Sequence, residues 1–224
     1  MNIFIAAEVY CIALTIIVKA VEIELGFPTA CGVPAVQREY KEPAERMKVP
    51  ATPYSWPWNV GIWSKLMGNF PYCGGALISN SLVLTAAHCL KLHFGCATIP
   101  VGIAFELAGV TPYKLQILLG SHDFTIRAKH EQAYIVQLAI VHPNFNQDAL
   151  LEGTDLAILK INGQVTKDFA TQPICFPSSR VKLSKGSLCF YTGWGKMYTE
   201  WSQGQLITPK VLKEAQIEVD FDEP

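Results

Sequence analysis

The sequence has 224 residues, of which 50% are hydrophobic and 17% charged, and its formal net charge at pH 7 is −1. A chain of this length can bury one or two cores, and its balanced charge offers nothing to attract a polyanion, so nucleic acid is excluded as a partner. Seven cysteines without a C-x-x-C metal-binding pattern favour a disulfide framework formed outside the cell.

The amino terminus agrees with that compartment. Residues 9–18 form a hydrophobic stretch of signal-peptide length, and Val18 and Ala20 occupy the small-residue positions of a cleavage site. The stretch is too short to span a bilayer. We therefore expect a signal peptide over 1–20, a secreted, extracellular protein and no membrane partner; a misassigned start codon is the alternative. Cleavage after Ala20 would remove Cys11 and leave six cysteines, an even number.

The next segments separate a short amino-terminal piece from a globular body. Residues 41–53 are polar, contain prolines and lack apolar periodicity, which predicts a linker. From Trp58 onward, short apolar runs such as 76–79, 82–85 and 156–161 alternate with Gly, Asn, Pro and Ser. Because no long stretch has the period of a helix, the sequence predicts an all-β barrel or sandwich.

Residues 72–89 form the strongest local unit. Two apolar strands are joined by the turn-forming pair Asn80-Ser81, a hairpin that brings Cys73 and Cys89 near one another. A disulfide between them would contribute about 3 kcal/mol in the chain-entropy model. It would also fix the backbone beside His88, as a general base requires.

Five motifs lead to a family. Thr85-Ala86-Ala87-His88-Cys89, Thr154-Asp155-Leu156-Ala157-Ile158-Leu159 and Thr192-Gly193-Trp194-Gly195 occur in the order and approximate spacing of the chymotrypsin/trypsin-like serine endopeptidases, peptidase family S1. Upstream, Cys31-Gly32-Val33-Pro34-Ala35 resembles the propeptide start of that family and Ser55-Trp56-Pro57-Trp58 its first strand. The resemblance runs from about Cys31 to the end of the sequence.

The resemblance implies an all-β, trypsin-like double β-barrel with a complete first barrel and an incomplete second one. It implies a propeptide-like segment and linker over 21–48 and a peptidase domain over 49–224. The implied activity is hydrolysis of peptide bonds, with protein or peptide substrates and protease inhibitors as partners and no cofactor.

The same resemblance assigns roles to two residues. In the family a serine attacks the scissile carbonyl, a histidine takes its proton, and an aspartate orients the imidazole; His88 and Asp155 match the last two roles. The other interpretations are a core histidine beside a disulfide for His88 and a strand-entry turn residue for Asp155. The apolar run after Asp155 suggests a strand buried on both faces, so its carboxylate would need a partner, and the His88 ring is the natural one.

The sequence contains no serine that matches the nucleophile. None of those after Asp155 lies in the Gly-Asp-Ser-Gly-Gly context that builds the oxyanion hole, and each is interpreted as a turn residue: Ser178, Ser179, Ser184, Ser187 and Ser202. We therefore expect a truncated form, inactive on its own, with an open second sheet prone to aggregate. The alternatives are a non-catalytic homologue acting as a protein-binding module and a gene-model or splicing error.

The resemblance also pairs cysteines. It joins Cys31 to Cys175 and Cys73 to Cys89, and it leaves Cys189, whose family partner lies in a segment not present, and Cys96, which has no counterpart. Both are expected to be unpaired.

Three departures from the family complete the expectations. The insertion at 92–114 is either a rim loop modulating substrate access or translated intron sequence. The candidate activation sites, Arg46-Met47 and Lys48-Val49, are not followed by an Ile-Val-Gly-Gly type of segment. No metal is expected, because three histidines lack ligand spacing and only one carboxylate matches a calcium-ligand position of the family. The histidines are His122, His130 and His142. The carboxylate is that of Glu131, and Ser121 stands where the calcium-binding members of the family would have another carboxylate.

Overall fold

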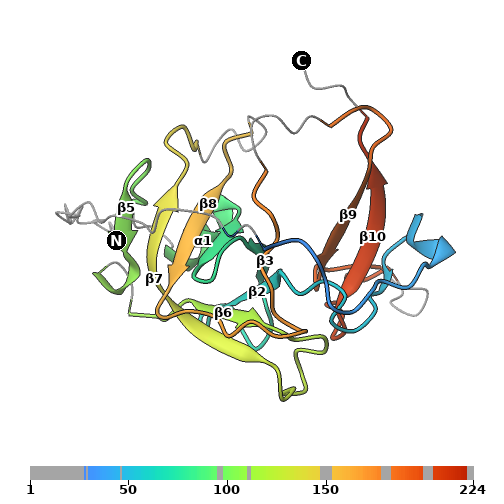
Figure 1. Ribbon diagram of the computed structural model, residues 1–224. Coiled ribbons are helices and arrows are strands. Elements are labelled where there is room, and N and C mark those ends of the chain that lie inside the picture. Colours follow the sequence, from blue (N-terminus) through green and yellow to red (C-terminus); the bar gives the residue numbers. More distant parts are fainter. Residues whose placement is uncertain are drawn as a thin grey trace, which may run out of the picture.

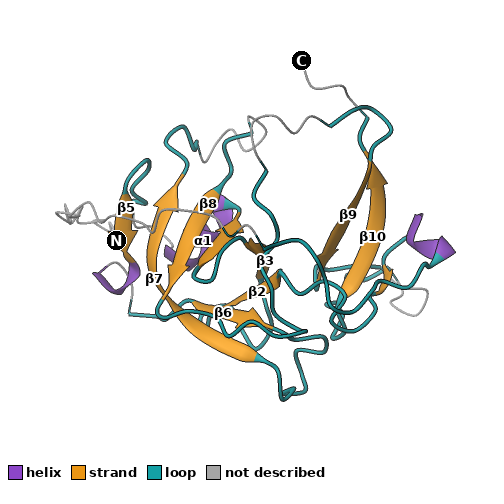
Figure 2. Cartoon of the chain, viewed as in Figure 1, coloured by secondary structure: helices purple, strands orange, loops and turns teal. Residues whose placement is uncertain are grey.

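The computed structural model describes residues 28, 30–45, 47–94, 98–109, 112–146, 153–177, 183–198 and 204–220. The predicted signal peptide, Cys11, Arg46 and Cys96 lie outside these residues. Most of the regular structure is strand, as Figure 2 shows, and the all-β prediction is confirmed. In chain order the elements are η1 (Glu42–Glu45), β1 (Val49–Pro50), β2 (Asn59–Trp63), β3 (Cys73–Leu77), β4 (Leu82–Thr85), α1 (Ala87–Phe94), β5 (Ala104–Glu106), η2 (Leu107–Gly109), β6 (Gln116–Leu119), β7 (Gln132–Val141), β8 (Ala157–Ile161), β9 (Leu188–Gly193) and β10 (Lys213–Glu218).

Six strands form a closed antiparallel barrel. The order along the sheet is β7-β6-β2-β3-β4-β8, and β8 pairs with β7 to close it. In Figure 1 this barrel is the larger group of strands, and β9 and β10 stand apart from it. The predicted hairpin is present, with β3 and β4 paired from Gly75↔Thr85 to Leu77↔Val83. Gly75 is required there, because a Cβ at this position would lie 2.7 Å from the carbonyl oxygen of Leu84.

The barrel interior is filled by residues that alternate along the strands. Val60, Ile62, Leu77 and Ile117 are almost completely buried. Strand β8 does not match the expectation of burial on both faces. Its burial alternates, with Ala157, Leu159 and Ile161 buried and the residues between them half-buried. The second face of this strand is less covered than its continuous apolar run suggested, since hydrophobic residues also occupy partly exposed positions.

The insertion at 92–114 is built into the barrel where the structure describes it. Helix α1 extends to Phe94, and β5 pairs with β7 from Ala104↔Ile140 to Glu106↔Leu138. Phe105 is fully buried in the barrel core, together with Ile99 and Leu107. This packing favours an integral structural segment over translated intron sequence, because unrelated sequence has no reason to complete a core.

The second sheet has three strands in the described part of the chain, in the order β1-β10-β9. The pairing of β1 with β10 includes Val49↔Glu214. Val49 is 8% exposed and Ala51 3% exposed; both belong to the stretch whose composition predicts a linker, whereas the resemblance places both in the peptidase domain over 49–224. That stretch is instead packed on the second sheet. A two-residue strand is too short to give a periodic pattern, so the sequence could not reveal it.

The Gly-Trp-Gly motif joins the two sheets. Trp194 is 4% exposed, packs with Ala51 and Leu212, and donates its indole N–H to the carbonyl of His122 at 3.3 Å. From the adjoining strand, the Thr192 hydroxyl donates to the side-chain oxygen of Asn59 at 2.8 Å. These contacts connect the barrel with the second sheet.

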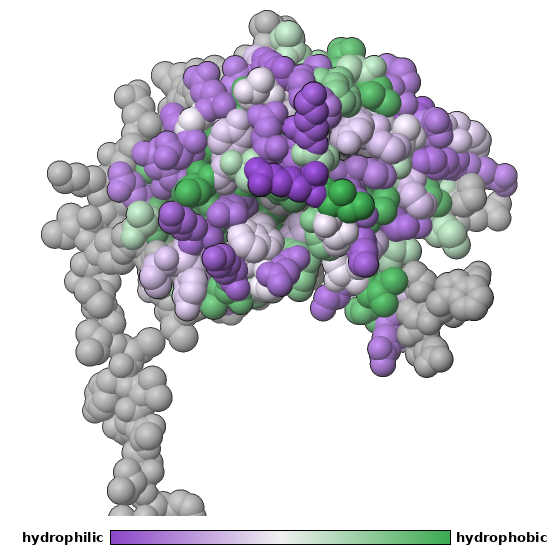
Figure 3. Space-filling model, turned by 90° about the horizontal axis from the view of Figure 1, so that it is seen from below, coloured by the Kyte–Doolittle hydropathy of each residue, from purple (hydrophilic) through white to green (hydrophobic). Residues whose placement is uncertain are grey.

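The outer surface is mixed in character. Figure 3 shows one face on which hydrophobic residues lie in small groups among hydrophilic ones. Within the described residues, no helix is both long and apolar enough to cross a bilayer.

Candidate active site

The candidate site lies where β4 leads into α1. Strand β4 ends at Thr85, whose hydroxyl donates to the carbonyl of Gly74 at 2.7 Å, and α1 begins two residues later at Ala87. His88 is the second residue of the helix, so its backbone N–H is one of those that no earlier helical carbonyl can satisfy.

Antiparallel pairing brings Asp155 to this helix end. Strands β4 and β8 are paired with Thr85 opposite Ala157, so the residue just after one strand lies near the residue just before the other. Asp155 precedes β8 by two positions and His88 follows β4 by three. Residues 67 positions apart in the sequence are thereby placed in contact.

One carboxylate holds both the backbone and the ring of His88. Asp155 Oδ1 accepts the His88 backbone N–H at 2.8 Å, and Asp155 Oδ2 lies 2.7 Å from His88 Nδ1. An ionised carboxylate can only accept a hydrogen bond, so Nδ1 carries the ring hydrogen, and Nε2 is the ring atom that can take up a proton. The arrangement thus selects the tautomer a general base requires.

The electrostatics of the pair favour an ionised carboxylate. Burial raises the pKa of Asp155, but hydrogen bonds from the His88 ring and backbone, with the charge of that ring, outweigh it, and the net pKa is lowered. The side chain of Asp155 is 20% exposed and that of His88 45%. The aspartate is therefore shielded, while the imidazole remains accessible from solvent.

A disulfide and a tyrosine fix the helix beneath the histidine. Cys73 and Cys89 are bonded to each other, and the Cys89 sulfur lies 3.6 Å from His88 Nε2. The Tyr72 hydroxyl donates to the carbonyl of Cys89 at 3.0 Å, and burial raises the pKa of this hydroxyl. Tyr72 was not predicted as a site residue. Its position beside the bridging cysteine was the available signal.

The structure also places the other predicted site residues that it describes. Cys31 and Cys175 form a disulfide, and Cys189 on β9 is a half-buried free thiol. Ser184 and Ser187 lie in the turn before β9, where the Ser187 hydroxyl accepts the Ser184 N–H at 3.2 Å. Ser178, Ser179 and Ser202 lie outside the described residues.

The metal-ligating side chains near the site do not form a metal centre. Cys73, His88 and Cys89 have ligand atoms within 4.8 Å of one another. The two sulfurs are joined in the disulfide, and a metal site requires thiolates. The geometry instead suits proton transfer through His88.

Comparisons with known proteins agree with this geometry. The family model named Trypsin matches residues 47–220. The human protein "Chymotrypsin-like elastase family member 3B" is 30% identical over 172 residues, which are 75% of this chain and 55% of that protein. The chain thus spans little more than half the length of this relative.

Solved structures give the same result. The structure titled "Structure of GrC" superposes with a TM-score of 0.59 at 25% identity, covering 77% of this chain and 64% of the other. The closed barrel with a second sheet has the architecture of the trypsin-like double β-barrel, and the predicted fold class is confirmed. The family model covers more than half of the chain, and the chain belongs to the trypsin family of serine proteases.

Proposed function

We propose that this chain carries the general base and its orienting carboxylate for a secreted trypsin-like serine endopeptidase. The observation that supports this most directly is the pair of contacts from Asp155 to His88, 2.8 Å to the backbone nitrogen and 2.7 Å to Nδ1. Family membership supports peptide bonds as the substrate class.

The proton path follows from the tautomer. His88 Nε2 accepts the proton of a serine hydroxyl as the serine oxygen bonds to the scissile carbonyl carbon, and the imidazolium then gives this proton to the leaving amine. Asp155 stays ionised throughout because its pKa is lowered, and it stabilises the imidazolium. The sequence supplies no serine in a Gly-Asp-Ser-Gly-Gly context, so we expect these 224 residues to be inactive on their own.

Two measurements test this proposal. The oxidised 224-residue chain is treated with a fluorophosphonate probe, which reacts with activated serines, and no labelling is expected. The transcript is also read beyond the Pro224 codon for a frame encoding Gly-Asp-Ser-Gly-Gly. A product containing that motif should be labelled and should hydrolyse peptides.

In such a product, Asp155→Asn should lower kcat by about 10⁴-fold with little change in fold, since the amide cannot hold the same tautomer. His88→Ala should produce a loss of similar or greater size. Hydrolysis at the parent rate by either variant would contradict the assigned roles, and labelling of the 224-residue chain would contradict its inactivity.

The second candidate is a non-catalytic homologue that binds proteins. It is favoured by a closed first barrel in a sequence that lacks the nucleophile motif. A stop codon after Pro224 in abundant message, with a stable secreted product, would select this role.

A further inference from the structure

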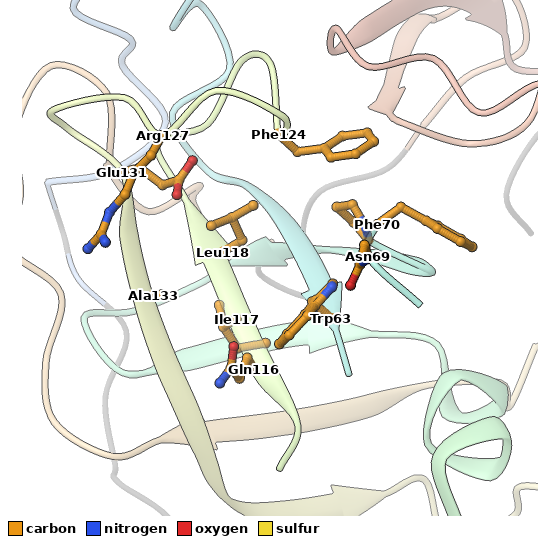
Figure 4. A pocket seen from close by; sticks show the side chains of 11 residues that line it. Trp63, Asn69, Phe70, Gln116, Ile117, Leu118, Phe124, Arg127, Glu131 and Ala133 are labelled. Atoms are coloured by element: carbon orange, nitrogen blue, oxygen red, sulfur yellow. The ribbon is translucent and has the colours of Figure 1, made fainter. Parts of the chain in front are cut away.

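A cavity separate from the His88–Asp155 pair lies on the outer side of the barrel. Its volume is about 410 Å³, and it lies between β2, β6, the start of β7 and the loops beside them. Figure 4 shows side chains from these elements surrounding it. The lining residues are Trp63, Asn69, Phe70, Pro71, Gln116, Ile117, Leu118, Phe124, Arg127, Glu131 and Ala133.

Aromatic rings form much of its wall. Trp63 ends β2, Phe70 lies in the loop before β3, and Phe124 follows β6; all three are half-buried. Phe124 is held in place by an edge-to-face contact with Trp194, with ring centroids 6.2 Å apart. The three rings are therefore partly exposed in the cavity wall, and the faces of aromatic rings attract cations.

The acidic residue that lines the cavity is Glu131. Oε2 of Glu131 is buried and has no hydrogen-bond partner among the described residues. Burial raises the pKa of the Glu131 carboxyl, and the nearby Ser121 hydroxyl and Arg127 guanidinium oppose that rise without cancelling it. A carboxylate with one oxygen buried without a donor is unfavourable, and a cation in the cavity beside this carboxylate would reduce that cost.

The neighbouring Arg127 does not form an ion pair with Glu131 in the described part of the chain. Arg127 is exposed, and Figure 4 draws its guanidinium on the opposite side of Glu131 from Phe124. Glu131 lines the cavity together with Leu118 and the aromatic rings, so a ligand in the cavity would lie beside this carboxyl group.

We propose that this cavity binds the cationic side chain of an arginine or lysine in a partner protein. The charged end would donate to Glu131, while its methylene groups would pack on Leu118 and the faces of Trp63 and Phe124. An apolar residue next to this arginine or lysine in the partner protein would pack on the aromatic wall of the cavity. The site uses neither His88 nor Asp155, so it is independent of the proposed proteolysis.

Binding of a basic peptide tests the proposal. The probe is Ac-Leu-Arg-Leu-NH₂, and its matched control has citrulline, a neutral isostere, in place of arginine. His88→Ala is used as the background so that no hydrolysis can consume the peptide. Affinity is measured by calorimetry, and the indole N–H resonance of Trp63, assigned with Trp63→Phe, reports where the peptide binds.

The expected pattern is specific to the cavity. The arginine peptide should shift the Trp63 resonance, and the citrulline peptide should bind at least about tenfold more weakly. Glu131→Gln should weaken arginine binding by a similar factor. Glu106→Gln, which changes the net charge equally on an exposed residue of β5, should leave the affinity unchanged. Arg127→Gln should not weaken binding.

Several results would overturn the proposal. These are an unshifted Trp63 resonance at millimolar peptide, equal binding of the two peptides, or equal losses for Glu131→Gln and Glu106→Gln. Calcium chloride is titrated alone as a further arm. One contrary result has two parts: calcium shifts the Trp63 resonance of the free protein, and added calcium releases the bound peptide over the same concentration range. In that case the cavity is a metal site, and the assignment to a cationic side chain is wrong.

Discussion

His93 is a buried histidine five residues after the candidate general base. It is 2% exposed, its Nε2 lies 3.1 Å from the carbonyl oxygen of Tyr113, and its Nδ1 is buried without a partner among the described residues. A carbonyl can only accept, so Nε2 carries the hydrogen and Nδ1 is unprotonated. The ring is therefore neutral and joins α1 to the end of the insertion.

Burial lowers the pKa of His93 below its ordinary value of 6.5, although the bond to Tyr113 opposes this. Below about pH 6.5 the unfolded chain then takes up a proton that the folded chain refuses, so the free energy of unfolding decreases as the pH falls. We expect His93→Gln, which can still donate to Tyr113, to show a smaller loss of stability between pH 7 and pH 5. Urea denaturation at both pH values measures it.

Lys91→Gln provides the matched control for this residue. Lys91 lies on the same helix and has no imidazole ring, so its replacement should leave the pH dependence unchanged. His122 is half-buried and burial also lowers its pKa, so it contributes part of the pH dependence in every variant. An identical loss in His93→Gln and the parent chain would exclude His93 as a source of acid sensitivity.

Strand β5 shows at the level of elements that the insertion contributes to stability. Phe105 is fully buried and its ring lies 5.9 Å from that of Phe94, with both in the barrel core. Removing a buried phenylalanine side chain leaves a cavity, so Phe105→Ala should lower the free energy of unfolding by about 3 to 5 kcal/mol. Urea denaturation of the oxidised chain measures this loss.

The neighbouring Ile103 serves as the control, because its 42% exposure places it outside the core. Ile103→Ala should change the stability by about 0.5 kcal/mol or less. If Phe105→Ala were as mild as Ile103→Ala, the insertion would be a loosely attached loop, and its packing against β7 would not contribute to the fold.

Elements with a local signal could be predicted from the sequence, and elements that depend on distant partners could not. The hairpin of β3 and β4 was predicted because Asn80-Ser81 and the flanking apolar residues specify it locally. Strand β5 has three residues and becomes regular only beside β7, so its composition looked like a broken apolar stretch. Treating 41–53 as a linker failed for the same reason, because β1 exists only through its pairing with β10.

The residues of the candidate site could likewise be predicted where a local motif marks them, and the cavity could not. The motif around His88 and the strand entry at Asp155 pointed to a proton-transfer pair, and the register of β4 and β8 puts the two side chains in contact. The cavity around Glu131 was not predicted. Its aromatic residues come from three separate segments, so no spacing in the sequence indicates that they share a wall.

At the scale of the whole molecule, the segment from Cys31 to Arg38 is attached to the rest of the protein at both ends. Arg38 Nε lies 2.8 Å from Glu214 Oε1, and the Trp56 indole N–H donates to Oε2 of the same carboxylate at 2.7 Å. Glu214 is fully buried, so these partners offset the cost of its charge. At the other end, Cys31 is bonded to Cys175, and Gly32 packs so close to this disulfide that a Cβ would lie 2.9 Å from the Cys175 sulfur.

The two disulfides should contribute unequally to stability because they restrict the unfolded chain to different degrees. Cys31 and Cys175 are 144 positions apart, whereas Cys73 and Cys89 are 16 apart. In the chain-entropy model the first bond contributes about 5 kcal/mol and the second about 3 kcal/mol. Arg38 and Glu214 hold the segment only in the folded state and cannot replace this effect. We expect the Cys31→Ala/Cys175→Ala variant to lose more stability in urea than Cys73→Ala/Cys89→Ala. The reverse order would mean that packing around the short disulfide, next to His88, outweighs the entropy of the long loop.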